Sequence, residues 1–306
     1  MKPVRRVDWS GCGTALVTPF DERGRIDFGA IERLVDWQIA EGVDFLVPCG
    51  TTGESATLSG DERKAVTASV VLAARGRVPV VAGAGGNHTA KAVFWARDAE
   101  AAGADGILSV SPMYNQPTAE GLVRHYSAIS DASRLPILVY NVPARTGSDL
   151  EVETILRLAE IPNVVGLKES STDFGRIARL MTRVPSDFAV FSGDDATALA
   201  LMALGGRGLI SVASNEIPRE MAALVHAARD GDWAQARKLQ SRWLPLMEMN
   251  LWESTPGPTK AALAMMKKCG ATVRLPLAPV HDTTRRRIET MLSGLKLLPR
   301  RAGTRR

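Results

Sequence analysis

The chain has 306 residues, 45% of them hydrophobic, and a formal net charge of +5. This length is sufficient for one large domain with a full core, and the chain contains no apolar run long enough to suggest a transmembrane helix. The three cysteines lie far apart, without metal-site spacing, which favours a reducing compartment such as the cytoplasm.

Most of the positive charge comes from four arginines among the last seven residues, 300–306. No aromatic residues are interleaved with them, so we expect a solvated tail and no nucleic-acid contact. The basic start of the chain has no apolar stretch behind it, so we expect no signal peptide and no membrane attachment.

Eight short apolar runs predict strands that are buried on both faces, as in a parallel sheet. They are Thr14–Val17, Phe45–Val47, Pro79–Ala82, Gly106–Val110, Ile137–Tyr140, Val164–Lys168, Ala189–Ser192 and Gly208–Val212. Helical patterns fill the gaps. The segment 59–62 has the form of a capping box, and later helices are expected to start at Thr89, Thr118 and Asp149.

This alternation predicts an α/β fold, a (β/α)8 TIM barrel over residues 1–230 that carries the active site. A doubly wound open sheet is the competing arrangement, but no glycine-rich dinucleotide fingerprint follows the first strand. Residues 231–306 are expected to form a C-terminal helical region with a basic tail. Its helices are Trp233–Met249, Thr259–Cys269 and Thr283–Leu295.

The sixth predicted strand runs from apolar residues directly into Lys168. Loss of solvation favours the uncharged amine, and an uncharged amine can attack a ketone to form a Schiff base. A lysine that snorkels at a strand edge is the alternative explanation. Polar groups at the ends of other strands favour the first explanation.

The carboxyl ends of barrel strands form the reactive face, and three loops there carry chemically useful residues. Glycines let the backbone of Thr51 and Thr52 approach an anion closely. Tyr140 and Tyr114 can pass protons if Thr51 links their hydroxyls, and the planar fork of Arg145 suits a carboxylate. Taken singly, each has an ordinary structural explanation.

Two further observations concern what the site does not use. Gly193, Asp194 and Asp195 follow the seventh strand, and we expect a structural role for both aspartates. The histidines are scattered, and neither a P-loop nor a nucleophile elbow is present. Imine chemistry requires neither a metal nor a cofactor, so we expect none.

Three motifs together resemble the dihydrodipicolinate synthase / N-acetylneuraminate lyase superfamily of class I aldolases. They are Gly50–Ser55, Tyr140–Gly147 and Gly166–Glu169, and the resemblance extends from about Gly13 to Leu298. The Thr-Thr pair and the arginine that follows Tyr-Asn-Val-Pro resemble the synthase branch of this family.

The resemblance implies that Lys168 forms an imine with pyruvate and that Tyr140 acts as the general acid and base. It implies that Thr51 relays protons between Tyr140 and Tyr114, which reaches in from a neighbouring subunit. The assembly it implies is a homotetramer, a dimer of dimers.

The resemblance also assigns substrate contacts. Thr52 would hold the carboxylate of pyruvate, Arg145 would receive the carboxylate of aspartate-4-semialdehyde, and Gly193 and Ile210 would line the pocket. The product would be 4-hydroxy-tetrahydrodipicolinate, in lysine and diaminopimelate biosynthesis.

The chain departs from lysine-inhibited members of the family at four positions. Met113 replaces a tyrosine, Gly60 and Arg63 stand near positions that carry histidines, and Lys91 replaces an acidic residue. A cation at position 91 would repel the ammonium groups of lysine. We therefore expect weak or absent feedback inhibition by lysine.

Two alternatives stay open at this point. Thr255 and Thr259 differ from the residues usual in the family and are compatible with a pyruvate-dependent sugar-acid aldolase or dehydratase, although Arg145 favours a carboxylated aldehyde. The other alternative is a catalytically silent barrel that binds a keto acid, since a fold alone does not establish an activity.

Overall fold

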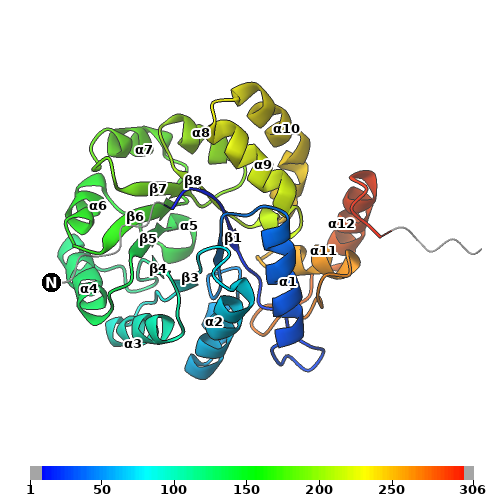
Figure 1. The fold of residues 1–306 in the computed structure, drawn as a ribbon, viewed down its shortest axis with the longest axis horizontal. Coiled ribbons are helices and arrows are strands. Elements are labelled where there is room, and N and C mark those ends of the chain that lie inside the picture. Colours follow the sequence, from blue (N-terminus) through cyan, green and yellow to red (C-terminus); the bar gives the residue numbers. More distant parts are fainter. Residues whose placement is uncertain (1–8, 300–306) are drawn as a thin grey trace, which may run out of the picture.

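The computed structural model describes residues 9–299, so the basic tail and the first eight residues lie outside the described part. Eight parallel strands form one sheet in the order β2-β1-β8-β7-β6-β5-β4-β3 (Figure 1). A parallel bridge between Leu46 and Val80 joins β2 to β3 and closes the barrel. The strands are β1 (Gly11–Ala15), β2 (Phe45–Val47), β3 (Val81–Gly83), β4 (Gly106–Val110), β5 (Ile137–Asn141), β6 (Val164–Glu169), β7 (Ala189–Ser192) and β8 (Gly208–Ser211). The predicted (β/α)8 fold is confirmed.

Helices surround the sheet and follow the strands in turn (Figure 1). Those of the barrel are α1 (Phe28–Ala40), α2 (Gly60–Ala74), α3 (Thr89–Ala101), α4 (Ala119–Ala132), α5 (Pro143–Thr146), α6 (Val152–Ala159), α7 (Phe174–Met181), α8 (Ala198–Ala203) and α9 (Pro218–Arg229). The C-terminal helices are α10 (Trp233–Met249), α11 (Gly257–Met265) and α12 (Asp282–Gly294). They gather at one side of the barrel, near α1 and α9 (Figure 1).

Helix starts follow the capping chemistry of the sequence in most places. Ser59 and Glu62 form the predicted capping box of α2, in which each side chain bonds the backbone of the other. Thr118 caps α4 through its side chain, and α3 begins at Thr89. These three predictions are confirmed.

The prediction that a helix starts at Asp149 is wrong. Helix α6 begins only at Val152. The carboxylate of Asp149 instead accepts hydrogen bonds from Asn141 Nδ2 at 2.6 Å and Ser171 Oγ at 3.1 Å. The side chain of Asp149 therefore binds residues of β5 and of the loop after β6, and it does not cap a helix.

The interior of the barrel has a hydrophobic core of its own. Phe45 and Phe191 meet there edge to face, with ring centroids 5.5 Å apart. Trp9 lies buried just before β1, and a Cβ at Gly106 would come within 1.9 Å of its ring. Trp9 thus fills the amino-terminal end of the barrel. The polar residues at the ends of the strands lie at the opposite, carboxyl-terminal end.

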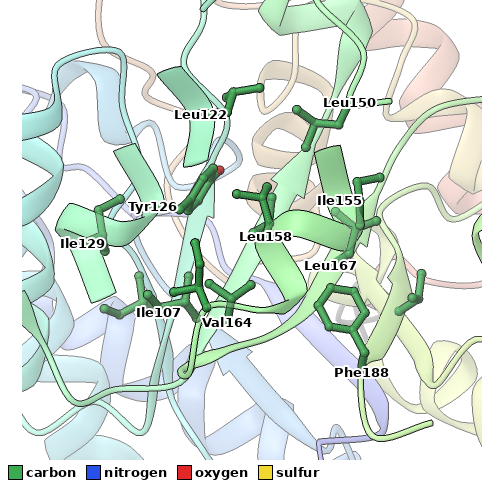
Figure 2. Close-up of a cluster of buried hydrophobic side chains, with 14 of the residues drawn as sticks. Ile107, Leu122, Tyr126, Ile129, Leu150, Ile155, Leu158, Val164, Leu167 and Phe188 are labelled. Atoms are coloured by element: carbon green, nitrogen blue, oxygen red, sulfur yellow. The ribbon is translucent and has the colours of Figure 1, made fainter. Parts of the chain in front are cut away.

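A second core lies between the sheet and the outer helices. Figure 2 shows its part around α4 and α6, where Leu122, Tyr126 and Ile129 face Ile155 and Leu158. Leu167 of β6 belongs to this outer core. Because side chains alternate along a strand, the next residue, Lys168, faces into the barrel.

Candidate active site

Lys168 lies at the carboxyl end of β6, paired in register with Tyr140 on β5 and Phe191 on β7. The residue is 5% exposed, and its Nζ lies 4.3 Å from the centroid of the Tyr140 ring. Within residues 9–299, no carboxylate forms an ion pair with this amine. The amine of Lys168 therefore lies beside the phenol of Tyr140 at the mouth of the barrel. No carboxylate of the described chain neutralises it.

Gly193 lies against Lys168, as expected for a residue that lines the pocket. A Cβ at this position would come within 2.8 Å of Lys168 Cε and 2.0 Å of Ser170 Oγ. Only glycine leaves this space free. Ile210 on β8 is fully buried and belongs to the same interior cluster as Tyr140.

Ser170 is a residue of the site that the sequence analysis missed. Its buried hydroxyl has no hydrogen-bond partner in the described chain. The strand alternation that points Lys168 inward gives the same direction to a residue two positions later. That alternation is the signal that could have found it.

The loop after β2 brings Thr51 and Thr52 to the same mouth. Thr51 is exposed and shares a small cavity of about 30 Å³ with Tyr140, whereas Thr52 is buried. Thr18 Oγ1 donates to the Gly53 carbonyl at 2.7 Å and fixes the back of the loop. The two predicted relay residues Thr51 and Tyr140 are therefore neighbours, although no direct hydrogen bond joins their hydroxyls in the described chain.

Tyr114 is not brought to this cavity within one chain. The residue is 90% exposed on the loop after β4, in a left-handed conformation with φ 70°. Its backbone N–H donates to the Thr146 carbonyl at 3.3 Å, which ties its loop to α5. Its predicted action on a neighbouring subunit stays a prediction.

Arg145 lies on α5, the single turn of helix that follows β5. Pro143 at the first helical position is suited to open such a turn. The Arg145 side chain is exposed and forms no ion pair with any carboxylate among residues 9–299. Its guanidinium is therefore free to receive an anion.

A buried polar network lies behind the Lys168–Tyr140 pair, on the outer face of the same two strands. Asn141 Nδ2 donates to Glu169 Oε1 at 2.8 Å, and Arg176 Nη2 donates to Glu169 Oε2 at 2.6 Å. Burial raises the pKa of Glu169, and the nearby Arg176 opposes this rise. Since Asn141 and Glu169 follow Tyr140 and Lys168 directly, this network fixes the position of Tyr140 relative to Lys168.

Both aspartates after β7 have structural roles, as predicted. Asp195 is buried and accepts hydrogen bonds from Ser211 Oγ at 2.5 Å and from Ala213 N at 3.0 Å. Asp194 Oδ1 accepts from Thr197 N at 3.0 Å, just before α8.

Arg63, one of the four departures noted above, is buried beside the small cavity. Its guanidinium stacks on Trp95 at 3.8 Å, and Nη2 donates to the Gly83 carbonyl at 2.9 Å. Lys91 is exposed and Met113 is half-buried. Weak lysine feedback stays a prediction.

Thr255 and Thr259 have a local explanation in the C-terminal region. Thr259 Oγ1 donates to Asn250 Oδ1 at 2.6 Å, and Thr255 Oγ1 donates to the Asn250 carbonyl at 2.8 Å. Both threonines therefore fix the start of α11 to the end of α10.

Residues 9–299 contain neither a metal-binding cluster nor a membrane-spanning helix. No group of three or more His, Cys, Asp or Glu is arranged to hold a metal ion. No helix in this range combines the length and the apolar character that crossing a membrane requires.

Known proteins of one family match nearly the whole chain in sequence and in fold. The sequence model of the dihydrodipicolinate synthetase family matches residues 8–295. The 4-hydroxy-tetrahydrodipicolinate synthase of Koribacter versatilis is 51% identical over 280 residues, which cover 91% of this chain and 93% of that protein. A crystal structure of dihydrodipicolinate synthase from Aquifex aeolicus has a TM-score of 0.93 at 38% identity, covering 96% of this chain and 100% of that one. The chloride-inhibited dihydrodipicolinate synthase from Acinetobacter baumannii, complexed with pyruvate, has a TM-score of 0.92 at 40% identity, covering 94% and 99%.

Proposed function

The chain belongs to the dihydrodipicolinate synthetase family, and we propose that Lys168 is the amine through which it condenses pyruvate with L-aspartate-4-semialdehyde. The enzyme is a lyase that forms 4-hydroxy-tetrahydrodipicolinate, in lysine and diaminopimelate biosynthesis. The observation that carries the role of Lys168 is its position: a largely buried amine 4.3 Å from the Tyr140 ring at the barrel mouth.

The first half of the mechanism activates pyruvate. Thr52 holds the pyruvate carboxylate, and Lys168 Nζ attacks the ketone carbon. Water leaves, and a protonated imine remains on the lysine. The imine draws electrons from the neighbouring methyl group, so a proton is lost from that carbon and an enamine forms. Tyr140 transfers the protons of these steps, through Thr51 to the phenol of Tyr114 from a neighbouring subunit.

The second half forms the carbon–carbon bond. Arg145 binds the carboxylate of aspartate semialdehyde, which places the aldehyde next to the enamine. The enamine carbon attacks the aldehyde carbon, and the oxygen takes up a proton. The amino group of the second substrate then attacks the imine carbon and displaces Lys168 Nζ, which closes the ring and frees the lysine.

Borohydride trapping tests the role of Lys168. Incubation with pyruvate and borohydride should add mass to the wild-type chain, with the modified peptide containing Lys168. Lys168→Arg should show no adduct and no measurable condensation, because the guanidinium stays protonated and is not a nucleophile. The matched control Lys238→Arg changes an exposed lysine of α10 and should keep both adduct and activity.

An unmodified wild-type chain would indicate a silent keto-acid-binding barrel. Condensation at wild-type speed in Lys168→Arg would contradict the proposed mechanism.

We further infer that the enzyme works in the cytoplasm as a homotetramer, a dimer of dimers. Support for the assembly comes from Tyr114, a tyrosine with a proposed catalytic role that is 90% exposed on the isolated chain. A residue of this kind gains both burial and function if a second copy covers its loop.

A further inference from the structure

A buried ion pair joins the active-site mouth to the C-terminal helices. Glu54 lies on the loop that carries Thr51 and Thr52, and Lys260 lies on α11, 206 residues later. Both side chains are 0% exposed, with Lys260 Nζ and Glu54 Oε1 at 2.5 Å. The mechanism described above uses neither residue.

The pair is completed by other groups of the C-terminal region. Lys260 Nζ also donates to the Thr272 carbonyl at 2.8 Å, and the backbone N–H of Arg274 donates to Glu54 Oε2 at 2.9 Å. Both oxygens of the Glu54 carboxylate are therefore bound by segments that follow the barrel. Removing one partner would leave a buried charge without compensation, which strongly destabilises proteins.

The backbone transmits the position of Glu54 to the substrate-binding residues. Its N–H donates to the Thr51 carbonyl at 3.1 Å, and its carbonyl accepts from Thr57 N at 2.9 Å. Glu54 adopts a left-handed conformation with φ 54°, which is unfavourable for a residue other than glycine. Such a conformation persists where surrounding contacts impose it, and the contacts from α11 and Arg274 do so here.

We propose that Glu54 and Lys260 are positioning residues that hold the Thr51–Thr52 loop in the conformation that binds the carboxylate of pyruvate. This inference rests on the proposed function, because it takes Thr52 as the pyruvate-binding residue. The C-terminal helices thereby contribute to substrate binding without touching the substrate.

Kinetics with each substrate in turn test this role. Lys260→Met removes the ammonium at similar length, and Glu54→Gln removes the charge at the same shape. We expect each variant to raise the KM for pyruvate by roughly tenfold or more, since small misplacements of binding groups are costly. The KM for aspartate semialdehyde should change by less than about twofold, because Arg145 lies on α5 and not on the Thr51–Thr52 loop.

A double variant separates positioning from stability. Glu54→Gln with Lys260→Met leaves no unpaired charge buried, so its melting temperature should recover relative to the single variants. Its KM for pyruvate should stay raised. Recovery of that KM together with the melting temperature would overturn the proposal.

The matched control is Asn163→Ala. Asn163 is buried at the amino-terminal end of the barrel, where its side chain donates to the carbonyls of Ser133 and Leu135. Its loss should lower the melting temperature without changing the KM for pyruvate. If Asn163→Ala raised the KM for pyruvate as much as Lys260→Met does, general destabilisation would explain the effect of Lys260→Met. That result would overturn the proposal.

Hydrogen exchange on the wild-type protein gives a test that needs no variant. Saturating pyruvate should slow exchange in the loop 50–55 and also in α11 and residues 271–274. Protection confined to the loop would overturn the proposal. Borohydride trapping in the same sample distinguishes failure of this positioning role from failure of the proposed function. A wild-type chain that forms no adduct with pyruvate would contradict the proposed function itself.

Discussion

Arg145 is the residue that distinguishes the two substrates in the proposed mechanism. Its exposed guanidinium has no carboxylate partner in the described chain, and α5, which carries it, is separate from the Thr51–Thr52 loop. Arg145→Ala should raise the KM for aspartate semialdehyde by roughly tenfold or more and the KM for pyruvate by less than about twofold. Steady-state kinetics with each substrate varied in turn would measure this.

Arg145→Lys is the matched comparison for that substitution. It keeps the charge but loses the planar fork that binds a carboxylate at two points, so its effect should be intermediate. Equal changes in both KM values would contradict the assignment and would favour an aldehyde without a carboxylate.

His125 gives the protein a pH-dependent stability that is independent of the site. The residue is buried on α4, where its Nδ1 lies 2.9 Å from Thr89 Oγ1. Burial lowers the pKa of His125 from 6.5 to about 4. Between these pH values the imidazole binds a proton in the unfolded chain but not in the folded one, and protonation therefore favours unfolding. The contribution of neutral His125 to the free energy of unfolding is complete above pH 6.5 and is lost as the pH falls toward 4.

The matched substitution is His125→Gln, which cannot titrate. The advantage of the wild type over this variant in free energy of unfolding should shrink by about 2 kcal/mol between about pH 8 and about pH 5. Urea unfolding at each pH would measure it. A constant difference across this range would show that His125 does not titrate differently in the two states.

At the level of the elements, the buried network behind β5 and β6 fixes the position of Lys168 relative to Tyr140. Arg176 on α7 is 6% exposed in its side chain and pairs with the fully buried carboxylate of Glu169. Arg176→Met should lower the free energy of unfolding by roughly 3–5 kcal/mol, because it leaves Glu169 buried without its cation. Denaturant unfolding would measure this loss.

The control for that prediction is Arg183→Met. Arg183 pairs with Glu153 on the exposed surface, where solvent screens the charges, so its loss should leave stability unchanged within error. Equal losses in the two variants would contradict the special role of the buried network.

The strands could be predicted because each is a buried apolar run. The bounds of β2, β4 and β7 match those expected, while β1 begins at Gly11 rather than Thr14. The glycines at the start of β1 have low strand propensity, so the apolar pattern does not reveal them. Gly13 is glycine because a side chain there would collide with Phe45, which is a tertiary cause.

The proximity of Lys168 and Tyr140 could be predicted because the fold places the ends of neighbouring strands together. The pair of Glu54 and Lys260 could not, since nothing local in either segment indicates a partner 206 residues away. Asp149 is a second case, because its side chain suits a helix cap but accepts a hydrogen bond from Ser171, 22 residues further along the chain. Long-range polar pairing is the part of the structure that local patterns do not contain.

At the level of the whole molecule, the proposed assembly makes a prediction about Tyr114. If its phenol completes the proton relay of a neighbouring subunit, Tyr114→Phe should lower kcat by roughly tenfold to a hundredfold without changing the oligomer. Activity assays and sedimentation velocity would measure the two effects.

Subunit mixing shows whether the phenol acts across an interface. Lys168→Arg and Tyr114→Phe are each defective alone, but a hybrid of the two contains some sites with both groups intact. Mixing after reversible dissociation should therefore restore part of the activity. No recovery in hybrids of confirmed composition would place the function of Tyr114 within its own chain.

The indole of Trp9 has a consequence for the order of events during turnover. Trp9 closes the amino-terminal end of the barrel, so both substrates must enter through the carboxyl-terminal mouth. The cyclic product must leave through the same opening. A molecule of product that lingers there excludes the next keto acid. Departure of one molecule and arrival of the next are therefore sequential events, and accumulated product should compete directly with pyruvate.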